Sequence, residues 1–301
     1  MKRFLAVAAS VTMIVVAIIV RGVIDDNGGS SSNGKRLTIA CVTELAAQCR
    51  EMKDADVRIE DASVTARRLA SESAGSVDID AWVTFDPWPQ VVDALAGYMQ
   101  EGPSALIASS PMVIAMVQER ADAFAPTCGG TTTWKCLGDA IGRPWTDVGG
   151  KAEWGTVKAG LPPPSSGLGL PLLGNASAAY FGNTNFATND FDSDFLVWKS
   201  KVTGTVASFD DFVLKFPAAF SAVGTLQVTA RDRGTKPVAS LATAPAGTVV
   251  VTVASYRGRP LPPQAEPLGR ALVAAGWDSP TASTTSGVPA PGVLLALSGL
   301  K

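Results

Sequence analysis

The sequence of 301 residues contains no histidine and only 4 cysteines. Histidine is the usual general base near neutral pH, so its absence argues against hydrolase chemistry. A zinc site is also disfavoured, because no imidazole can complete a mixed site and no C-x-x-C pair is present. We therefore expect neither a metal nor another cofactor.

Charge is scarce as well. Charged residues make up 17% of the chain, and the net charge is −2. Nucleic-acid binding requires clustered Lys and Arg, and basic pairs such as Arg67-Arg68 are typical of solvated surface. We expect no nucleic-acid partner.

Catalytic signatures are missing too: the sequence has no G-x-S-x-G, H-E-x-x-H or Walker A motif. The S-x-x-K motif at Ser32–Lys35 falls in a flexible linker, and Gly167-x-Gly169 lacks the third glycine of a dinucleotide loop. We expect a protein that is not an enzyme. The alternative is an enzyme outside the cytoplasm that uses the carboxylates of Asp78, Asp80 and Asp86.

An N-terminal apolar run is present. Lys2 and Arg3 precede the uncharged stretch Phe4–Val20, and Arg21 closes it. About 17 such residues is the lower limit for a membrane-spanning helix, and no A-x-A-like cleavage site follows. We predict an uncleaved signal anchor over residues 1–24, with a cleaved signal peptide as the alternative. Basic residues before the run place it with its amino end in the cytoplasm and the rest of the chain outside.

The cysteines fall into two close pairs. Cys41 and Cys49 lie eight residues apart, as do Cys128 and Cys136. Four cysteines allow three connectivities. We favour the one with two local bonds, Cys41–Cys49 and Cys128–Cys136, because each bond closes a small loop. Such disulfides persist in an oxidising compartment, which agrees with the location predicted from the N-terminus.

The remaining sequence predicts an α/β domain. Residues 25–35 (DDNGGSSSNGK) form a Gly/Ser-rich flexible linker. Strands and helices of about ten residues then alternate, which indicates βαβ units and a mostly parallel sheet. We predict strands over residues 36–42, 57–61, 77–85, 154–159, 226–230 and 248–256. Predicted helices cover residues 43–52, 63–73, 87–99, 191–199, 209–222 and 264–275, with another from about 166; residues 126–150 and 279–291 are predicted loops.

Polar residues mark two of the predicted strands, one directly after the strand and the other within it. Thr43 comes directly after the first strand, where it either caps the next helix or contacts a ligand. Asp78 and Asp80 share one face of the third strand, which also carries Trp82 as a core or cleft residue and is followed by Trp88.

Two serine motifs also attract attention. Ser109-Ser110-Pro111 breaks an apolar run, and we expect the chain to pass there from one sheet into another. Ser165 and Ser166 precede a predicted helix. Either the serine hydroxyls and the free N–H groups of the first turn bind a polar ligand, or a serine simply caps the helix.

The order of these motifs resembles that of the type 2 periplasmic solute-binding proteins associated with ABC transporters. The matching pieces, in order, are RLTIACVTEL, VDIDAWVTFDPW, SSPMVIAMV, PPPSSGLGL, GTLQVTARD, TVVVTVASY and RALVAAGWD. The resemblance covers about Arg36 to Leu300. Many members carry a lipid-bearing cysteine near the amino terminus, whereas this chain has none there.

The resemblance implies two α/β lobes joined by a hinge, with a small-molecule ligand enclosed between them. Lobe 1 would comprise about residues 36–109 and 235–301, and lobe 2 about residues 110–234. A membrane permease is the implied partner, and the alternative is a cell-envelope scaffold or sensor without transport. The implied cleft residues are Thr43, Glu44, Trp82, Ser110, Ser165, Ser166 and Thr229.

Overall fold

A computed structural model describes residues 36–71, 77–96, 102–204, 216, 219–231, 237–256, 258–280 and 285–300. Residues Leu37–Lys301 form one compact unit. The predicted anchor Phe4–Val20 and the linker lie outside the described residues. Within the described ranges, no helix is both long and apolar enough to cross a membrane.

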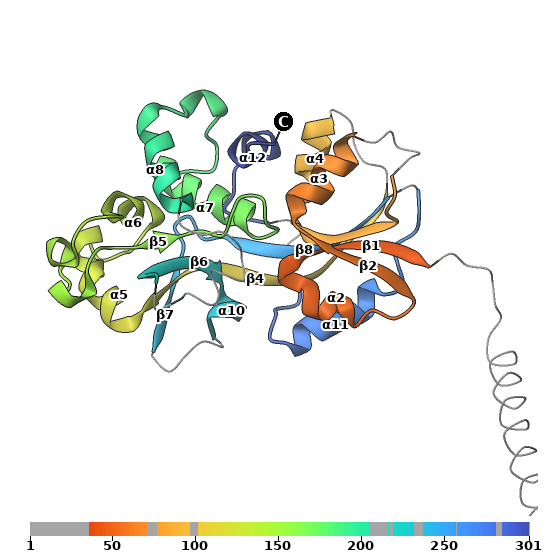
Figure 1. Ribbon diagram of the computed structural model, residues 1–301, viewed down its shortest axis with the longest axis horizontal. Coiled ribbons are helices and arrows are strands. Elements are labelled where there is room, and N and C mark those ends of the chain that lie inside the picture. Colours follow the sequence, from red (N-terminus) through yellow and green to blue (C-terminus); the bar gives the residue numbers. More distant parts are fainter. Residues whose placement is uncertain are drawn as a thin grey trace, which may run out of the picture. The chain divides into compact units, whose positions relative to one another are not determined.

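Eight strands form one mixed sheet (Figure 1). Their order is β2-β1-β3-β8-β4-β6-β5, and β7 pairs with β4. The bounds are β1 Leu37–Val42, β2 Ala55–Glu60, β3 Ala81–Asp86, β4 Ser104–Val117, β5 Ala159–Gly160, β6 Ala222–Leu226, β7 Val238–Ala242 and β8 Thr248–Ser255.

Strand β4 joins the two halves of this sheet. Its residues Ser104–Pro111 pair with β8, whereas its later residues pair with β6 and β7. The passage predicted at Ser109–Pro111 is therefore found as a passage from one half of this single sheet to the other. Because β7 pairs with Val113–Val117, it groups with the second lobe, beyond the boundary at residue 234 expected from the sequence.

The prediction of a mostly parallel sheet is wrong. Parallel pairing joins β1 to β2, β1 to β3 and β5 to β6. Antiparallel pairing joins β8 to β3 and β4, and β4 to β6 and β7. The alternation of strands and helices describes the parallel strands β1, β2 and β3 correctly. Sequence periodicity does not reveal that β8 returns from far along the chain to lie between β3 and β4.

Helices cover both faces of the sheet. In Figure 1, α3 and α4 lie on one side of β1 and β2, while α2 and α11 lie on the other. α12 packs against α4 and α7. The helices are α2 Ala46–Arg50, α3 Ala62–Ser71, α4 Trp88–Ala96, α5 Gln118–Phe124, α6 Trp134–Ala140, α7 Gly169–Phe181, α8 Ser193–Thr203, α10 Gln227–Arg231, α11 Ala265–Ala274 and α12 Pro291–Ser298. Short 3₁₀ helices cover Thr43–Leu45, Ala125–Cys128, Trp145–Val148, Ala152–Trp154 and Thr188–Asp190.

Several predicted elements are different in the structure. The strand predicted at 226–230 is helix α10, whose second residue, Val228, donates its N–H to Ser110 Oγ at 3.2 Å. The strand predicted at 154–159 is reduced to Ala159–Gly160, because Gly155 adopts a φ of 70° and turns the chain. α6 lies within the predicted loop 126–150. Of the predicted helix 209–222, residues 209–215, 217 and 218 lie outside the described residues, and Ala222 begins β6.

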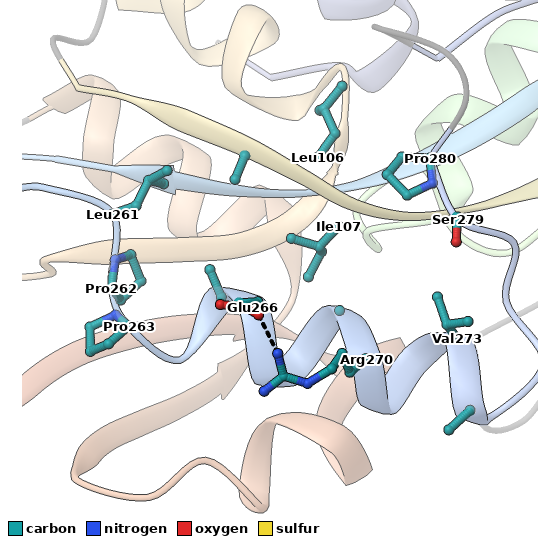
Figure 2. A pocket seen from close by; sticks show the side chains of 14 residues that line it. Leu106, Ile107, Leu261, Pro262, Pro263, Glu266, Arg270, Val273, Ser279 and Pro280 are labelled. Atoms are coloured by element: carbon teal, nitrogen blue, oxygen red, sulfur yellow. Dashed lines mark hydrogen bonds and ion pairs between the residues drawn. The ribbon is translucent and has the colours of Figure 1, made fainter.

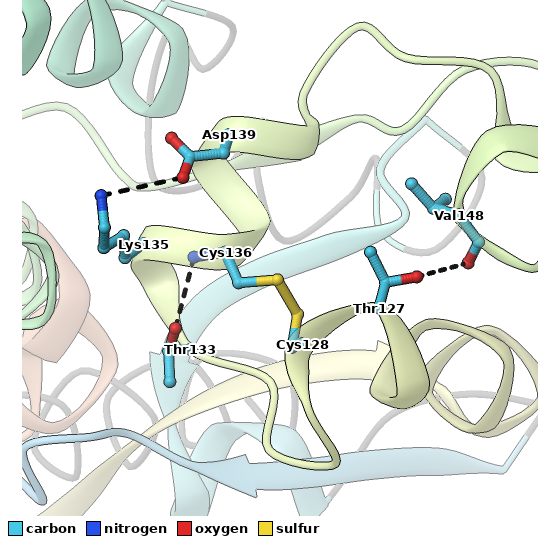
Figure 3. Close-up of a disulfide and its surroundings, with 7 residues drawn as sticks. All are labelled: Thr127, Cys128, Thr133, Lys135, Cys136, Asp139 and Val148. Carbon is cyan, nitrogen blue, oxygen red and sulfur yellow. Dashed lines mark hydrogen bonds and ion pairs between the residues drawn. A yellow bond between two sulfur atoms is a disulfide. The ribbon is translucent and has the colours of Figure 1, made fainter.

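Both local disulfides are confirmed. Cys41–Cys49 joins the end of β1 to α2. Cys128–Cys136 joins a 3₁₀ helix to the first turn of α6 (Figure 3). Thr133 Oγ1 accepts the N–H of Cys136 at 3.3 Å, so the bridged turn also carries the N-cap of α6.

Candidate ligand-binding site between the two lobes

The two lobes meet where β1 ends and α7 begins. Glu44 lies in the short helix that follows β1, and Leu168 immediately precedes α7. The Leu168 N–H donates to Glu44 Oε1 at 2.8 Å, while the Gly169 N–H donates to Ser166 Oγ at 3.0 Å. A carboxylate of lobe 1 therefore caps the N-terminus of a lobe 2 helix, where free N–H groups and the helix dipole favour negative charge.

Burial controls the ionisation of Glu44. Removal from water raises the pKa of its carboxyl above 4.5, although hydrogen bonds from the Leu168 and Glu44 N–H groups and from the Ser166 and Thr43 hydroxyls act in the opposite direction. The carboxyl is thus held by several donors in a place where charge is costly.

Further hydrogen bonds join the two lobes at this contact between the end of β1 and the start of α7, which we call the seam. Trp88 Nε1 donates to the Gly167 carbonyl at 2.8 Å, and the Ser63 N–H at the start of α3 donates to the Ser165 carbonyl at 3.0 Å. A Cβ at Gly167 would lie 2.9 Å from Glu44 Oε2 and 3.0 Å from a Phe85 ring carbon. Only glycine fits this close approach without displacement of its neighbours.

The structure gathers four of the seven predicted cleft residues at this seam: Thr43, Glu44, Ser165 and Ser166. Thr43 Oγ1 donates to the Glu44 carboxylate at 3.3 Å. Ser165 takes part through its backbone carbonyl.

The other three predicted residues lie elsewhere. Trp82 is 0% exposed, and its ring lies in the core, 6.3 Å from the ring of Trp88. Ser110 is buried and accepts the N–H of Val228. Thr229 is half-buried on the same helix, α10. Ser110 and Thr229 thus belong to the surroundings of α10.

A cavity of about 560 Å³ lies beside the seam. Lobe 1 contributes Asp86, Pro87 and Gln90 from the end of β3 and the start of α4, and lobe 2 contributes residues 184–186 after α7. The segment that leads into α12 supplies the third wall, including Thr285. The cavity is therefore bounded by parts of both lobes.

Asp86 joins two walls of this cavity by hydrogen bonds. Its side chain is 3% exposed, Oδ2 accepts the Thr285 N–H at 2.6 Å, and Oδ1 accepts Gln90 Nε2 at 2.8 Å. Asn175 on α7 also binds the segment that leads into α12, since its Nδ2 donates to the Gly287 carbonyl at 2.9 Å. Sequence reasoning singled out Asp86 only as a catalytic alternative and missed Gln90 and Thr285. No local pattern connects residues that are 199 positions apart.

The other two carboxylates of the enzyme alternative hold structure together. Asp78 is paired with Arg58 and Arg68. Asp80 accepts the Thr38 N–H at 2.8 Å and pairs with Arg259, so it ties β1 to the start of β3. Both thus have structural partners away from the cavity.

A second hollow, along α11, is larger and apolar. Figure 2 shows it between the first residues of β4 and the helix, with Leu106, Ile107 and Val273 along its walls. Its volume is about 920 Å³. Glu266 and Arg270 form an ion pair with each other there. The described residues that line it all belong to lobe 1, so a ligand held by them would not bridge the two lobes.

No protein-family model and no curated protein sequence matches the chain. Among solved structures, it is similar to the periplasmic binding protein AfuA from Actinobacillus pleuropneumoniae, with exogenous fructose-6-phosphate bound, at 13% identity and a TM-score of 0.50 over 77% of each chain. A two-component system protein that mediates signal transduction matches at 12% identity and a TM-score of 0.50, over 79% of this chain and 81% of that chain. The periplasmic binding protein P5PA matches at 12% identity and a TM-score of 0.49, over 85% of this chain and 89% of that chain.

Proposed function

We propose that this protein captures a small polar solute between its two lobes, outside the cytoplasm, as a membrane-anchored solute-binding protein. The fold is the two-lobed α/β architecture of type 2 periplasmic binding proteins. The observation that carries the proposal is that polar groups from both lobes converge at one seam: Glu44 from the first and the N-terminus of α7 from the second.

The connections between the lobes support this function. β4 passes from one half of the sheet to the other, and the chain returns between β7 and β8. Lobes linked by so few segments can separate by a hinge motion at those segments. Opening would break the bond from Leu168 to Glu44 and expose both groups to a solute.

The location and the partner belong to the same proposal. The apolar run Phe4–Val20 would anchor the chain, with the folded part outside the cytoplasm. The two disulfides suit an oxidising compartment. A membrane permease of the ABC type would receive the solute, and no catalytic step is required of this chain.

A ligand screen tests the proposal. The full-length protein in detergent is heated with amino acids, sugars, oxyanions, organic acids and amines while its tryptophan fluorescence is followed. A ligand at 100 times its Kd should stabilise the fold by about 2.7 kcal/mol through mass action. If no compound raises the melting temperature, the proposal fails and a cell-envelope scaffold or sensor becomes the better account.

The scaffold alternative also has one observation in its favour. The seam is closed by the protein's own groups, because Glu44 occupies the N-terminus of α7 and Trp88 holds Gly167. A protein that remained closed in this way would bind no solute there, and the same screen separates the two functions.

A further inference from the structure

We infer that the cavity at Asp86 recognises a small compound carrying a primary ammonium or guanidinium group. This inference rests on the proposed function and specifies the ligand class of the space between the lobes. It concerns residues that the resemblance to solute-binding proteins did not single out: Asp86, Gln90 and Thr285.

The first argument is charge. Asp86 lies almost wholly out of water, and its partners here, Thr285 N–H and the Gln90 amide, are neutral donors. Among the described residues that line the cavity, none is Lys or Arg. A buried carboxylate without a cationic partner is costly, so a ligand cation would supply the missing charge.

The second argument is an unused acceptor. Gln90 Nε2 donates to Asp86, which fixes the amide orientation because a flipped amide would place its oxygen against the carboxylate. Gln90 Oε1 is then buried, and no hydrogen bond reaches it among the described residues. Leaving a buried acceptor unsatisfied costs about 1–3 kcal/mol, and a ligand N–H that reaches this oxygen through a small shift of the surrounding side chains would remove that cost.

Together these groups select donors over acceptors. A carboxylate has about four lone-pair sites, and Asp86 uses two of them for Gln90 and Thr285 N–H. An anionic ligand would meet the Asp86 charge and the Gln90 oxygen with no cation to offset them. Phe186, Val288 and prolines form the apolar part of the lining, which suits a short aliphatic chain attached to the cationic group, while Thr184 and Asn185 add neutral polar groups without a charge.

The experiment measures binding of putrescine and agmatine to the full-length protein in detergent, by thermal shift and calorimetry. Mannitol, a sugar phosphate and citrate serve as neutral and anionic comparisons. We expect the amines to raise the melting temperature and the other compounds to have a smaller effect or none. If mannitol or an anion stabilises the protein and the amines do not, the ligand class is wrong while the proposed function stands.

If no compound of any class binds, the proposed function fails together with this inference. Variants at Gln90 locate the binding. Gln90→Lys supplies a cation inside the cavity and should weaken amine binding at least about tenfold. Gln90→Glu places a second carboxylate beside Asp86 and should strengthen amine binding, because a ligand cation relieves the repulsion between the two carboxylates.

Gln118→Lys and Gln118→Glu are the matched controls, because Gln118 is exposed at the start of α5 and its side-chain amide donates to Asp122, away from the cavity. They should leave the amine affinity unchanged. Equal effects of Lys and Glu at position 90, or equal effects at positions 90 and 118, would overturn the assignment of the site.

Discussion

At the scale of single residues, Gly167 and Glu44 define how closely the lobes approach. Gly167 has backbone contact with Trp88 and close contact with Glu44 and Phe85. Glu44 supplies the acceptor for α7. The missing side chain at Gly167 thus leaves the space that the Glu44 carboxylate occupies.

Gly167→Ala should destabilise the protein by about 1–3 kcal/mol, because the added Cβ would overpack the seam. Urea unfolding followed by tryptophan fluorescence measures this change. Gly292→Ala is the control, since a Cβ there would meet nothing within 4 Å, and its effect should stay within about 0.5 kcal/mol. Equal stability of the two variants would show that the seam is looser than described.

Glu44→Gln tests the buried carboxyl. Because folding raises the Glu44 pKa above 4.5, this group contributes stability that is fully present below pH 4.5 and is lost as pH rises through the raised value. The free energy of unfolding of the wild type should therefore fall relative to that of Glu44→Gln as pH rises from 4.5.

Urea titrations at a series of pH values measure that difference. Glu51→Gln, seven residues along the chain at an exposed position, controls for the loss of a carboxylate and should keep the pH profile of the wild type. A Glu44→Gln profile that runs parallel to the wild type would contradict the prediction.

At the scale of elements, the two disulfides close loops of equal length in different surroundings. Cys41 and Cys49 are each 0% exposed, because their bridge lies between β1 and α2 in the core of the first lobe. Cys128 and Cys136, by contrast, are half-buried. Equal spacing in the sequence therefore leads to unequal access for a reductant.

Mild dithiothreitol under native conditions should open Cys128–Cys136 before Cys41–Cys49. Alkylation followed by peptide mass spectrometry reads out which thiols have been released. Loss of either bridge should lower stability by roughly 2–3 kcal/mol in the chain-entropy model for loops of this length. Prior opening of Cys41–Cys49, or a Cys49–Cys128 link, would show that this arrangement is wrong.

At the scale of the whole molecule, the seam couples both lobes. Ser63 of lobe 1 and Leu168 of lobe 2 each donate a backbone N–H across it. If the lobes separate as rigid bodies, these two amides become accessible to water in the same event. Their exchange rates then report one opening equilibrium.

Trp88→Phe removes the bond to the Gly167 carbonyl and keeps most of the buried ring. It should favour opening by about 0.5–1.5 kcal/mol and accelerate hydrogen exchange at Ser63 and Leu168 by the same factor. Trp198→Phe is the control, because Trp198 Nε1 has no hydrogen-bond partner in the described part of the chain. Faster exchange at Leu168 alone would mean that the α7 loop opens locally.

The predicted anchor is tested on the whole chain in cells. Because Phe4–Val20 is an uncharged run long enough to span the bilayer, the full-length protein should stay with the membrane after a carbonate wash. Replacing Val15 and Val16 with Asp should release it or prevent its insertion, since charges in the middle of such a helix are costly. Release of a shortened wild-type form that starts near Gly22–Gly29 would instead show a cleaved signal peptide.

The sequence by itself determined the features that depend on neighbouring residues. Short spacing identified both disulfides, the break at Ser109–Pro111 located the passage between the two halves of the sheet, and alternating strands and helices described β1 to β3 of the first lobe. Tertiary structure alone decided the rest. β8 lies between β3 and β4, and α10 forms where a strand was predicted, because partners from distant parts of the chain supply their hydrogen bonds. Asp86 likewise meets Thr285 only through the fold, since long-range contacts reflect packing and leave no periodic pattern in the sequence.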